Sequence, residues 1–285
     1  MLNSSEETPQ SFQLSHFTDI KKIGSGKFGK VFSAVEIKSG VKVALKVVYK
    51  DLLDQYDFYS QMKKELEIQY RLSEHPNIVK MHAYFYDKNC IFSVLEYAEE
   101  GNLYQKLKRL GKGEGFPEEI ARKIIQQLIA ALWYCQERNV IHRDIKPENI
   151  LVIDSRTWHI KLCDFGWSTH TINQSRSTFC GTPDYLAPEL VKKTELSYDY
   201  KIDNWAAGIL AYELLTGASP FAPLTGASSG QGDIYKNIQN VDLCYNKIYE
   251  TKVSDSAKDF ISQILIVDPI KRLDLRQISE HPWLN

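Results

Sequence analysis

The chain has 285 residues, of which 43% are hydrophobic and 25% charged, and its formal net charge is -1. This balance is typical of a globular protein, and a net charge near zero gives no overall electrostatic basis for binding nucleic acid or a membrane surface. The five cysteines are scattered without CxxC spacing. They therefore indicate free thiols in a reducing compartment and argue against a zinc site.

In chain order, residues 1–16 are polar and have the composition of a flexible tail without a signal-peptide core, so we expect a protein of the cytoplasm and nucleus. The pattern is then mostly strand-like, with one helix, until the polar residues 99–102 indicate a hinge. Beyond the hinge, apolar residues recur with helical spacing, as in 120–132. We expect an α+β, two-lobed fold: residues 17–98 form a small β-rich lobe, and residues 99–285 form a larger helical lobe.

A glycine-rich motif follows the first strand-like stretch. It consists of Gly24, Ser25, Gly26, Lys27, Phe28 and Gly29. Three glycines allow the backbone to approach phosphate oxygens closely, because no Cβ atoms intervene, although such a hairpin is often only a turn. A dinucleotide-binding fold needs a helix directly after the last glycine. Here the strand pattern resumes at Val31, which excludes that fold.

The next strand, at residues 43–47, carries a lysine. Strand alternation places Ala44 and Lys46 on one face and the apolar residues Val43, Leu45 and Val47 on the other. A lysine beside a small residue suits a nucleotide, whose flat base packs on the small residue while the lysine reaches the phosphates. Taken alone, a surface lysine on an amphipathic strand explains this pattern better.

A helix is expected from about residue 58 to residue 72, and it contains two candidate partners for Lys46. Periodicity places Glu65 on the inward stripe with Met62 and Gln69, whereas Glu67 lies about 200° away around the helix. A buried carboxylate without a partner would be costly, so we expect Glu65 to pair with Lys46. The alternative is an ion pair on the helix surface.

Three further motifs lie in the helical part. They are His142-Arg143-Asp144-Ile145-Lys146-Pro147-Glu148-Asn149, Asp164-Phe165-Gly166 and Ala187-Pro188-Glu189. Together with the three elements above, their order and spacing match the protein-kinase signature. The chain therefore resembles a protein kinase over residues 17–284, which is nearly its whole length.

Finer features resemble the Aurora family of kinases. They are Glu-Leu-Glu-Ile-Gln at 65–69, Asp-Phe-Gly-Trp-Ser at 164–168 and Arg-Ser-Thr-Phe-Cys-Gly-Thr at 176–182. Trp167 directly after the Asp-Phe-Gly motif, and the polar Gln69 where most kinases keep an apolar residue, are characteristic of that family. Another serine/threonine kinase that prefers basic sites remains the nearest alternative.

The resemblance implies a serine/threonine kinase that uses ATP and Mg²⁺. In this family Lys46 holds the α- and β-phosphates and Glu65 orients Lys46. Asp144 accepts the proton of the substrate hydroxyl or orients that hydroxyl. Lys146 neutralises charge on the transferred phosphoryl group, and a lysine at this position is typical of serine/threonine kinases.

The resemblance also assigns the nucleotide and metal positions. Besides residues 24–29, the nucleotide-binding set is Val31, Ala44, Lys46, Leu95, Glu96, Tyr97, Ala98, Glu148, Asn149, Leu151 and Asp164. Within this set Val31, Ala44 and Leu151 sandwich the adenine. Leu95 is the gatekeeper, and the backbone of 96–98 bonds the adenine edge. Asn149 and Asp164 bind Mg²⁺, a hard cation suited to carboxylate and amide oxygens.

Substrate binding is assigned to Glu148, Glu213 and Thr182. The two glutamates match acidic positions that read an arginine two residues before the target, because a carboxylate and a guanidinium pair bidentately. We therefore expect Arg-x-Ser/Thr sites.

Regulation is assigned to Thr178, which aligns with the family's phosphorylated threonine and lies two residues after Arg176. Its phosphate would bind Arg143, Lys64 and Arg176. Lys64 departs from the family, which has an arginine there. Lysine cannot form a bidentate fork, so we expect a weaker phosphate pocket.

Five residues are expected to support the site. Glu189 pairs with Arg272 at the base of the activation segment, and Asp203 supports the catalytic loop. His142 and Phe165 are packing residues. Cys163, which borders the nucleotide site, is either a reactive thiol or an inert buried one.

A pseudokinase scaffold would lack the lysine, aspartates or asparagine named above, and all are present. A nucleotide-binding regulatory module would not explain Asp144. Expected partners are protein substrates and an activator that docks on the small lobe. We expect a monomeric catalytic domain that binds neither nucleic acid nor membrane, with roles in mitosis at the spindle, centrosome or chromosomes. Residues 223–232 are expected to form a loop that is longer than the corresponding loop of the family.

Overall fold

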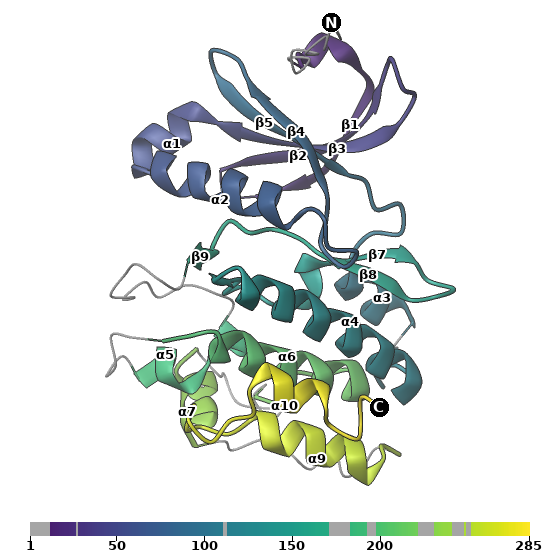
Figure 1. Cartoon of the computed structure of the whole chain (residues 1–285), viewed down its shortest axis with the longest axis vertical. Helices are drawn as coiled ribbons and strands as arrows, with labels where there is room; N and C mark the ends of the chain where they lie inside the picture. The colour runs from purple at the N-terminus through teal and green to yellow at the C-terminus, as the bar shows by residue number, and fades with distance from the viewer. Residues whose placement is uncertain are drawn as a thin grey trace, which may run out of the picture. The chain divides into compact units, whose positions relative to one another are not determined.

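The computed structural model describes residues 12–26, 28–110, 113–170, 183–192, 198–221, 231–240, 248 and 252–285. The chain divides into two compact units. The N-terminal unit comprises Met1–Ser73 and Val79–Tyr97, and the C-terminal unit comprises Glu74–Ile78 and Ala98–Asn285. Figure 1 shows a β-sheet with helices in the first unit and a mainly helical second unit, which is the two-lobed kinase fold.

The N-terminal unit is built on a five-stranded antiparallel sheet in the order β1-β2-β3-β5-β4. Its elements are η1 (Leu14–His16), β1 (Phe17–Ser25), β2 (Gly29–Glu36), β3 (Lys42–Tyr49), α1 (Lys50–Tyr56), α2 (Tyr59–Leu72), β4 (Met81–Tyr86) and β5 (Cys90–Glu96). As expected from strand alternation, Val43, Leu45 and Val47 of β3 lie together in one apolar cluster of the sheet. Stacked rings of Phe17, Phe85 and Phe92 complete this cluster. Ala44 and Lys46 therefore lie on the opposite face of β3.

Two expectations for this unit need correction. The unit has two α-helices rather than one, because α1 precedes the predicted α2 and packs Leu53 against Val48 and Met62. Residues 12–16 are not simply tail, since they include η1 and the ring of Phe12 stacks on Phe17 at 5.7 Å. The remainder of the predicted tail, residues 1–11, lies outside the described residues.

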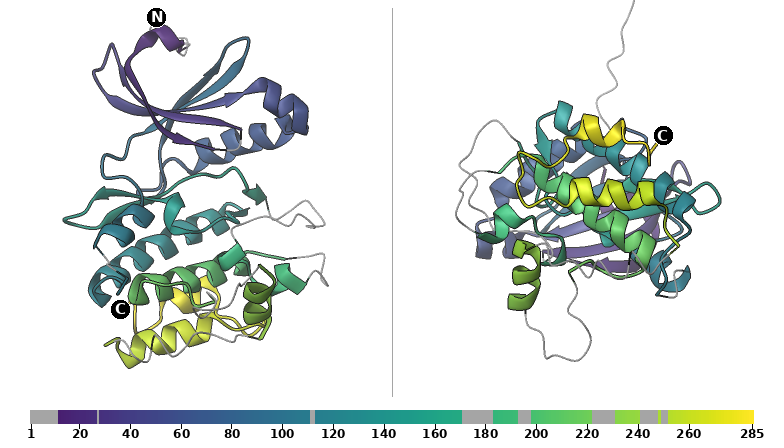
Figure 2. Two further views of the ribbon diagram at one scale, coloured as in Figure 1. Left: turned by 180° about the vertical axis from the view of Figure 1, so that it is seen from behind. Right: turned by 90° about the horizontal axis from the view of Figure 1, so that it is seen from below.

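The C-terminal unit is organised around α6. Its elements are α3 (Leu103–Leu110), α4 (Glu118–Glu137), β6 (Val140–Ile141), η2 (Pro147–Asn149), β7 (Ile150–Asp154), β8 (His159–Leu162), β9 (Thr169–His170), η3 (Pro183–Tyr185), α5 (Pro188–Lys192), α6 (Lys201–Thr216), α7 (Gln231–Asn240), α9 (Asp255–Ile264) and α10 (Leu275–Ser279). Helix α6 is buried along almost its whole length and packs against α4 and α9 (Figures 1 and 2). It ends at Gly217, whose positive φ of 71° favours glycine and where a Cβ would lie 2.7 Å from the Gly115 nitrogen.

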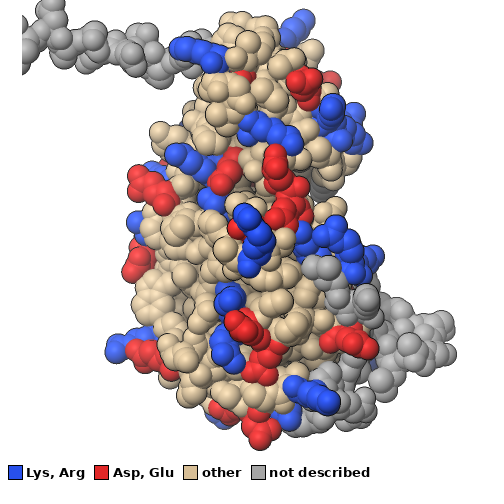
Figure 3. Space-filling model, turned by 90° about the vertical axis from the view of Figure 1, so that its right-hand side faces the viewer, with Lys and Arg blue, Asp and Glu red and all other residues tan. Residues whose placement is uncertain are grey.

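Short connections carry the chemistry on this scaffold. The loop between β6 and β7 holds the His142–Asn149 motif, and the segment after β8 holds Asp164. On the face drawn in Figure 3, lysine and arginine side chains are interleaved with aspartate and glutamate, and the described residues there form no large patch of one sign. In the part of the chain that the structure describes, every helix is too short or too polar to cross a bilayer.

Candidate active site

The N-terminal unit pairs the two residues expected to hold phosphates. The Nζ atom of Lys46 on β3 lies 2.5 Å from Oε1 of Glu65 on α2, and both side chains are mostly buried, with 25% and 14% exposure. Glu67 instead forms an ion pair with Arg71 on the outer face of α2, where both side chains are far more exposed. Helical periodicity therefore identified the correct glutamate.

Sheet register brings the predicted adenine-binding residues to the Lys46 face. Val31 lies opposite Lys46, and Ala44 lies opposite Leu95. Directly opposed residues in an antiparallel pair point to the same side, and so do residues two apart. Gly24, opposite Val31, belongs to the same set. These positions form one small, mostly apolar surface with a lysine at one end, which suits a base attached to phosphates.

The glycines of residues 24–29 differ in what they require. A Cβ at Gly29 would lie 1.8 Å from the carbonyl oxygen of Val47, so the pairing of β2 with β3 itself demands glycine. A Cβ at Gly26 would meet nothing within 4 Å. The fold therefore leaves open space at Gly26, which fits a role in admitting phosphate oxygens. Ser25 ends β1, and Lys27 lies outside the described residues.

Phe28 has a packing contact that the sequence did not indicate. Its ring lies 4.7 Å from Phe58 and 5.9 Å from Tyr56, in the apolar cluster of α1 and α2. Its backbone carbonyl also accepts a hydrogen bond of 3.0 Å from the Tyr49 nitrogen. The Phe28 side chain thus anchors the hairpin between β1 and β2 to the helices.

The segment expected to bind the adenine edge lies at the end of β5. The Glu96 nitrogen donates to the Lys80 carbonyl at 2.9 Å, and the Lys80 nitrogen donates to the Glu96 carboxylate at 3.2 Å. The ammonium of Lys42 lies 4.3 Å from the ring centre of Tyr97. Ala98 is the first residue of the long stretch of the C-terminal unit. In that unit Leu151, on β7, forms a bridge with Asn102.

The catalytic loop of the C-terminal unit brings three polar side chains together. Lys146 Nζ lies 2.9 Å from Oδ2 of Asp144, and the Asn149 amide nitrogen donates to the same Oδ2 at 2.8 Å. The side chain of Asp144 is 6% exposed. Asp144 is therefore held at a fixed orientation by a cation and an amide, as a group that must position a substrate hydroxyl requires.

The loop is supported from α6 and from the core. Carboxylate oxygens of Asp203 accept from the backbone nitrogens of His142 at 2.7 Å and Arg143 at 2.9 Å. Burial raises the pKa of Asp203, while the two donors and nearby positive charge act to lower it. His142 is fully buried and packs edge-on against Phe165 at 4.8 Å, which confirms that both are packing residues.

The residues present fit a magnesium ion. Asn149 uses its amide nitrogen on Asp144, which directs its amide oxygen away from that carboxylate. The Cys163 nitrogen donates to the Asn149 carbonyl at 2.9 Å, which ties the residue before Asp164 to the catalytic loop. One carboxylate and one amide oxygen are few ligands, but Mg²⁺ in nucleotide sites is completed by phosphates and waters. Among the described residues no cluster of three histidine, cysteine or acidic side chains is suited to another metal.

The acidic residues expected to read the substrate lie in the C-terminal unit. Glu213 on α6 accepts a hydrogen bond from the hydroxyl of Tyr185. Burial raises the pKa of Glu213, and the charges of Glu148 and Asp184 raise it further. Glu148 is exposed on η2. Sequence reasoning missed Tyr185 and Asp184, because only the fold brings η3 close to α6. Thr182 lies outside the described residues.

Two of the four expected regulatory residues lie in the part of the chain that the structure describes. Thr178 and Arg176 lie outside the described residues, and so does most of the 223–232 segment. Lys64 lies one residue before Glu65 on α2, in the N-terminal unit. Arg143, in the C-terminal unit, hydrogen-bonds to the carbonyl of Trp167 and to Tyr198, a partner that the sequence did not indicate.

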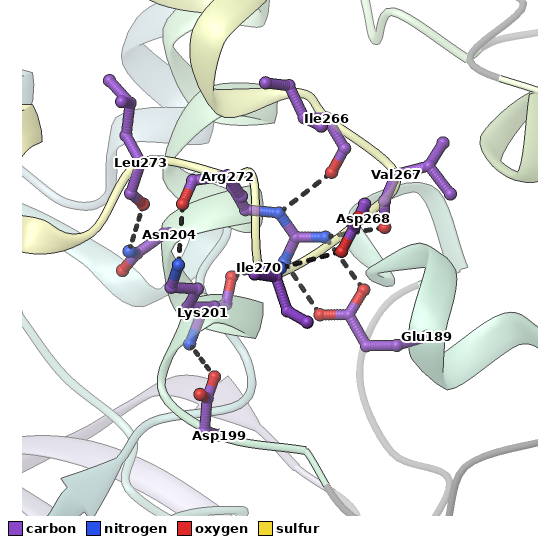
Figure 4. Close-up of polar contacts among 10 residues, drawn as sticks. All are labelled: Glu189, Asp199, Lys201, Asn204, Ile266, Val267, Asp268, Ile270, Arg272 and Leu273. Atoms are coloured by element: carbon purple, nitrogen blue, oxygen red, sulfur yellow. Dashed lines mark hydrogen bonds and ion pairs between the residues drawn. The ribbon is translucent and has the colours of Figure 1, made fainter.

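Arg272 forms the expected pair with Glu189 (Figure 4). Its two terminal nitrogens lie 2.8 and 2.9 Å from the two carboxylate oxygens of Glu189. The guanidinium also donates to the carbonyls of Lys201, Ile266 and Val267, and its side chain is fully buried. This bidentate pair fixes the short helix α5 to the segment before α10.

Comparison with known proteins agrees with this geometry. The protein kinase domain family matches residues 17–284. An Aurora kinase of Schizosaccharomyces pombe is 44% identical over 276 residues, which cover 96% of this chain and 73% of that protein. The serine/threonine-protein kinase Aurora-2 of Arabidopsis thaliana is 43% identical over 281 residues, which cover 99% of this chain and 94% of that protein.

An Aurora kinase of Dictyostelium discoideum is 42% identical over 264 residues, and the chain spans 64% of its length. Matches of this identity and coverage, together with the complete set of kinase motifs, show the family. The chain belongs to the Aurora family of serine/threonine protein kinases.

Proposed function

We propose that this chain transfers the γ-phosphate of ATP to serine or threonine in Arg-x-Ser/Thr sites of protein substrates. The observation that carries the proposal is the arrangement of Asp144 with Lys146 and Asn149, because it combines a positioned carboxylate with an adjacent cation. Phosphoryl transfer depends on positioning and charge neutralisation far more than on covalent chemistry.

In the proposed mechanism, Lys46 binds the α- and β-phosphates and Glu65 orients it. Asp164 and Asn149 would hold Mg²⁺, which supplies further positive charge to the phosphates. Asp144 orients the attacking hydroxyl and accepts its proton, and Lys146 neutralises charge on the phosphoryl group. Each role rests on the family resemblance and on the contacts described above.

For substrate choice, we propose that Glu148 and Glu213 bind an arginine two residues before the target, with Thr182 beside the target residue. The Tyr185 hydroxyl directs one oxygen of Glu213, which leaves the other oxygen for a guanidinium.

A peptide library varied around serine or threonine tests this choice with purified protein, ATP and Mg²⁺. We expect phosphorylation of Arg-x-Ser/Thr peptides and less than about 1% of that rate in Asp144→Asn. A proline-directed or acidic preference would contradict the substrate assignment, and full activity of Asp144→Asn would contradict the mechanism.

We further propose that phosphorylation of Thr178, in trans by a second copy of the chain, activates the enzyme. A phosphate there adds roughly -1.5 to -2 charge and could bind Arg143, Arg176 and Lys64, which would order the activation segment and α2 together. Thr178→Ala should lose most activity, Arg143→Ala should reduce activation by the phosphate, and Lys64→Arg should maintain or strengthen it. Equal activity of unphosphorylated and phosphorylated protein would refute this switch.

By family membership we propose a role in cell division, in the cytoplasm and nucleus and at the spindle, centrosome or chromosomes. We also propose a monomeric catalytic domain with an activating protein on the N-terminal unit. A fluorescent fusion followed through mitosis tests the localisation. A uniform distribution at every stage would contradict it.

A further inference from the structure

The side chain of Arg143 is held from two sides within the C-terminal unit. Its Nε donates to the carbonyl oxygen of Trp167, and its Nη1 donates to the hydroxyl of Tyr198 at 2.7 Å. Trp167 directly follows the Asp-Phe-Gly motif, whereas Tyr198 lies three residues before α6. One guanidinium therefore connects the catalytic loop, the segment after Asp164 and the segment that leads into α6.

Tyr198 occupies a fixed place. The residue is 8% exposed, and the chain after it enters α6 through Asp199, whose carboxylate accepts from the Lys201 nitrogen at 2.8 Å. Tyr198 is therefore buried itself and lies next to a helix that is buried along almost its whole length.

Arg143 is thus held through its backbone by α6 and through its side chain by the segment before α6. Asp203 accepts from its backbone nitrogen at 2.9 Å, and Tyr198 accepts from its side chain. The backbone of Arg143 has a positive φ of 70°, a strained conformation for a non-glycine residue that persists only where the surroundings fix it. Asp144 is the next residue, so a shift of the Arg143 backbone would displace the Asp144 carboxylate directly.

We propose that Tyr198 is a positioning residue, which holds Arg143 and through it Asp144 while the activation segment is unphosphorylated. This inference rests on the proposed function, in which Arg143 also receives the phosphate of Thr178. A hydroxyl is a neutral acceptor and a phosphate a charged one, so the phosphate replaces and exceeds the contribution of Tyr198 once it is present. Tyr198 therefore supports the basal activity, and its contribution shrinks on phosphorylation.

The test compares Tyr198→Phe with wild type in two preparations, one treated with a phosphatase and one fully phosphorylated, each verified by mass spectrometry. Without the phosphate, we expect kcat to fall about tenfold, as for loss of one hydrogen bond to a charged group, with the KM for ATP unchanged. With the phosphate, the loss should be about threefold or less. Tyr200→Phe is the matched control, because it removes a phenol hydroxyl from the same segment without a contact to Arg143, and it should retain wild-type kcat.

A second comparison separates positioning from general packing. In an Arg143→Ala background, Tyr198→Phe should cause no further loss, because the hydroxyl has nothing left to hold. An equal loss with and without Arg143, an equal loss in both phosphorylation states, or no loss in the unphosphorylated enzyme would each overturn the proposal. If Arg143→Ala instead leaves activation by the phosphate intact, the proposed phosphate receptor is wrong, whichever result Tyr198→Phe gives without the phosphate.

Discussion

Removal of the Glu189 carboxylate should destabilise the C-terminal unit strongly. The Arg272 side chain is fully buried and that of Glu189 is 8% exposed, so the positive charge left behind in Glu189→Ala would have no access to water. Breaking a buried pair by removing one partner typically costs about 3–5 kcal/mol. Three backbone carbonyls remain as acceptors for the guanidinium, but none of them neutralises its charge.

This loss of unfolding free energy is large compared with the total stability of a domain. A domain is stable by about 5–15 kcal/mol, so the substitution would remove a third or more of that in a typical case. Glu189→Gln keeps one oxygen as an acceptor and should cost less, about 2 kcal/mol. Helix α5 has five residues, too few for a helix to be stable alone, so its position should be lost together with the pair.

Urea denaturation monitored by circular dichroism measures these differences. The matched control is Glu67→Gln, because the pair of Glu67 with Arg71 is exposed and contributes about 0.5 kcal/mol or less. Arg272→Met combined with Glu189→Leu provides a further check. If the charge left behind is the cause, this double variant should be more stable than Glu189→Ala. A loss below about 1 kcal/mol in Glu189→Ala, or a loss equal to that of Glu67→Gln, would refute the reasoning.

Three further predictions concern the site. Lys46→Met and Asp164→Asn should each retain less than about 1% of turnover while circular dichroism shows that both variants remain folded, and turnover above a few per cent would contradict the assigned roles. Burial raises the pKa of Glu213, so the preference for substrates with arginine should weaken as the pH falls through that raised pKa, at a higher pH than for an ordinary glutamate. Phosphorylation rates on paired peptides that carry either arginine or glutamine measure this preference. A constant ratio of the two rates down to pH 4.5 would contradict the prediction. ATP should protect Cys163 from alkylation as measured by mass spectrometry, whereas absence of any labelling would indicate an inert thiol.

Local periodicity predicted much of the candidate site. The 3.6-residue repeat of α2 separated Glu65 from Glu67, and strand alternation placed Ala44 and Lys46 away from the apolar cluster. Both rules depend only on neighbours along the chain. The motif spacing then supplied the order of the remaining parts, but it carried no information on their contacts.

Contacts between distant segments were beyond this reasoning. Tyr198 and Arg143 are 55 positions apart, and no repeat or spacing relates them. The bond between Tyr185 and Glu213 likewise depends on how η3 packs beside α6. Helix α1 was missed because it spans only seven residues and buries only Leu53, so its pattern is too short to show a period.

Substitutions of Gly29 and of Gly26 should differ in the way that the resulting defect is inherited. A side chain at Gly29 collides with the backbone of β3, so alleles at that codon should yield a protein that cells degrade. A side chain at Gly26 meets empty space, so alleles there should yield a well-folded protein that admits nucleotide poorly. Such a protein would still bind the substrates proposed above without phosphorylating them. Two codons of one motif would therefore produce opposite inheritance, with recessive loss at Gly29 and dominant interference at Gly26.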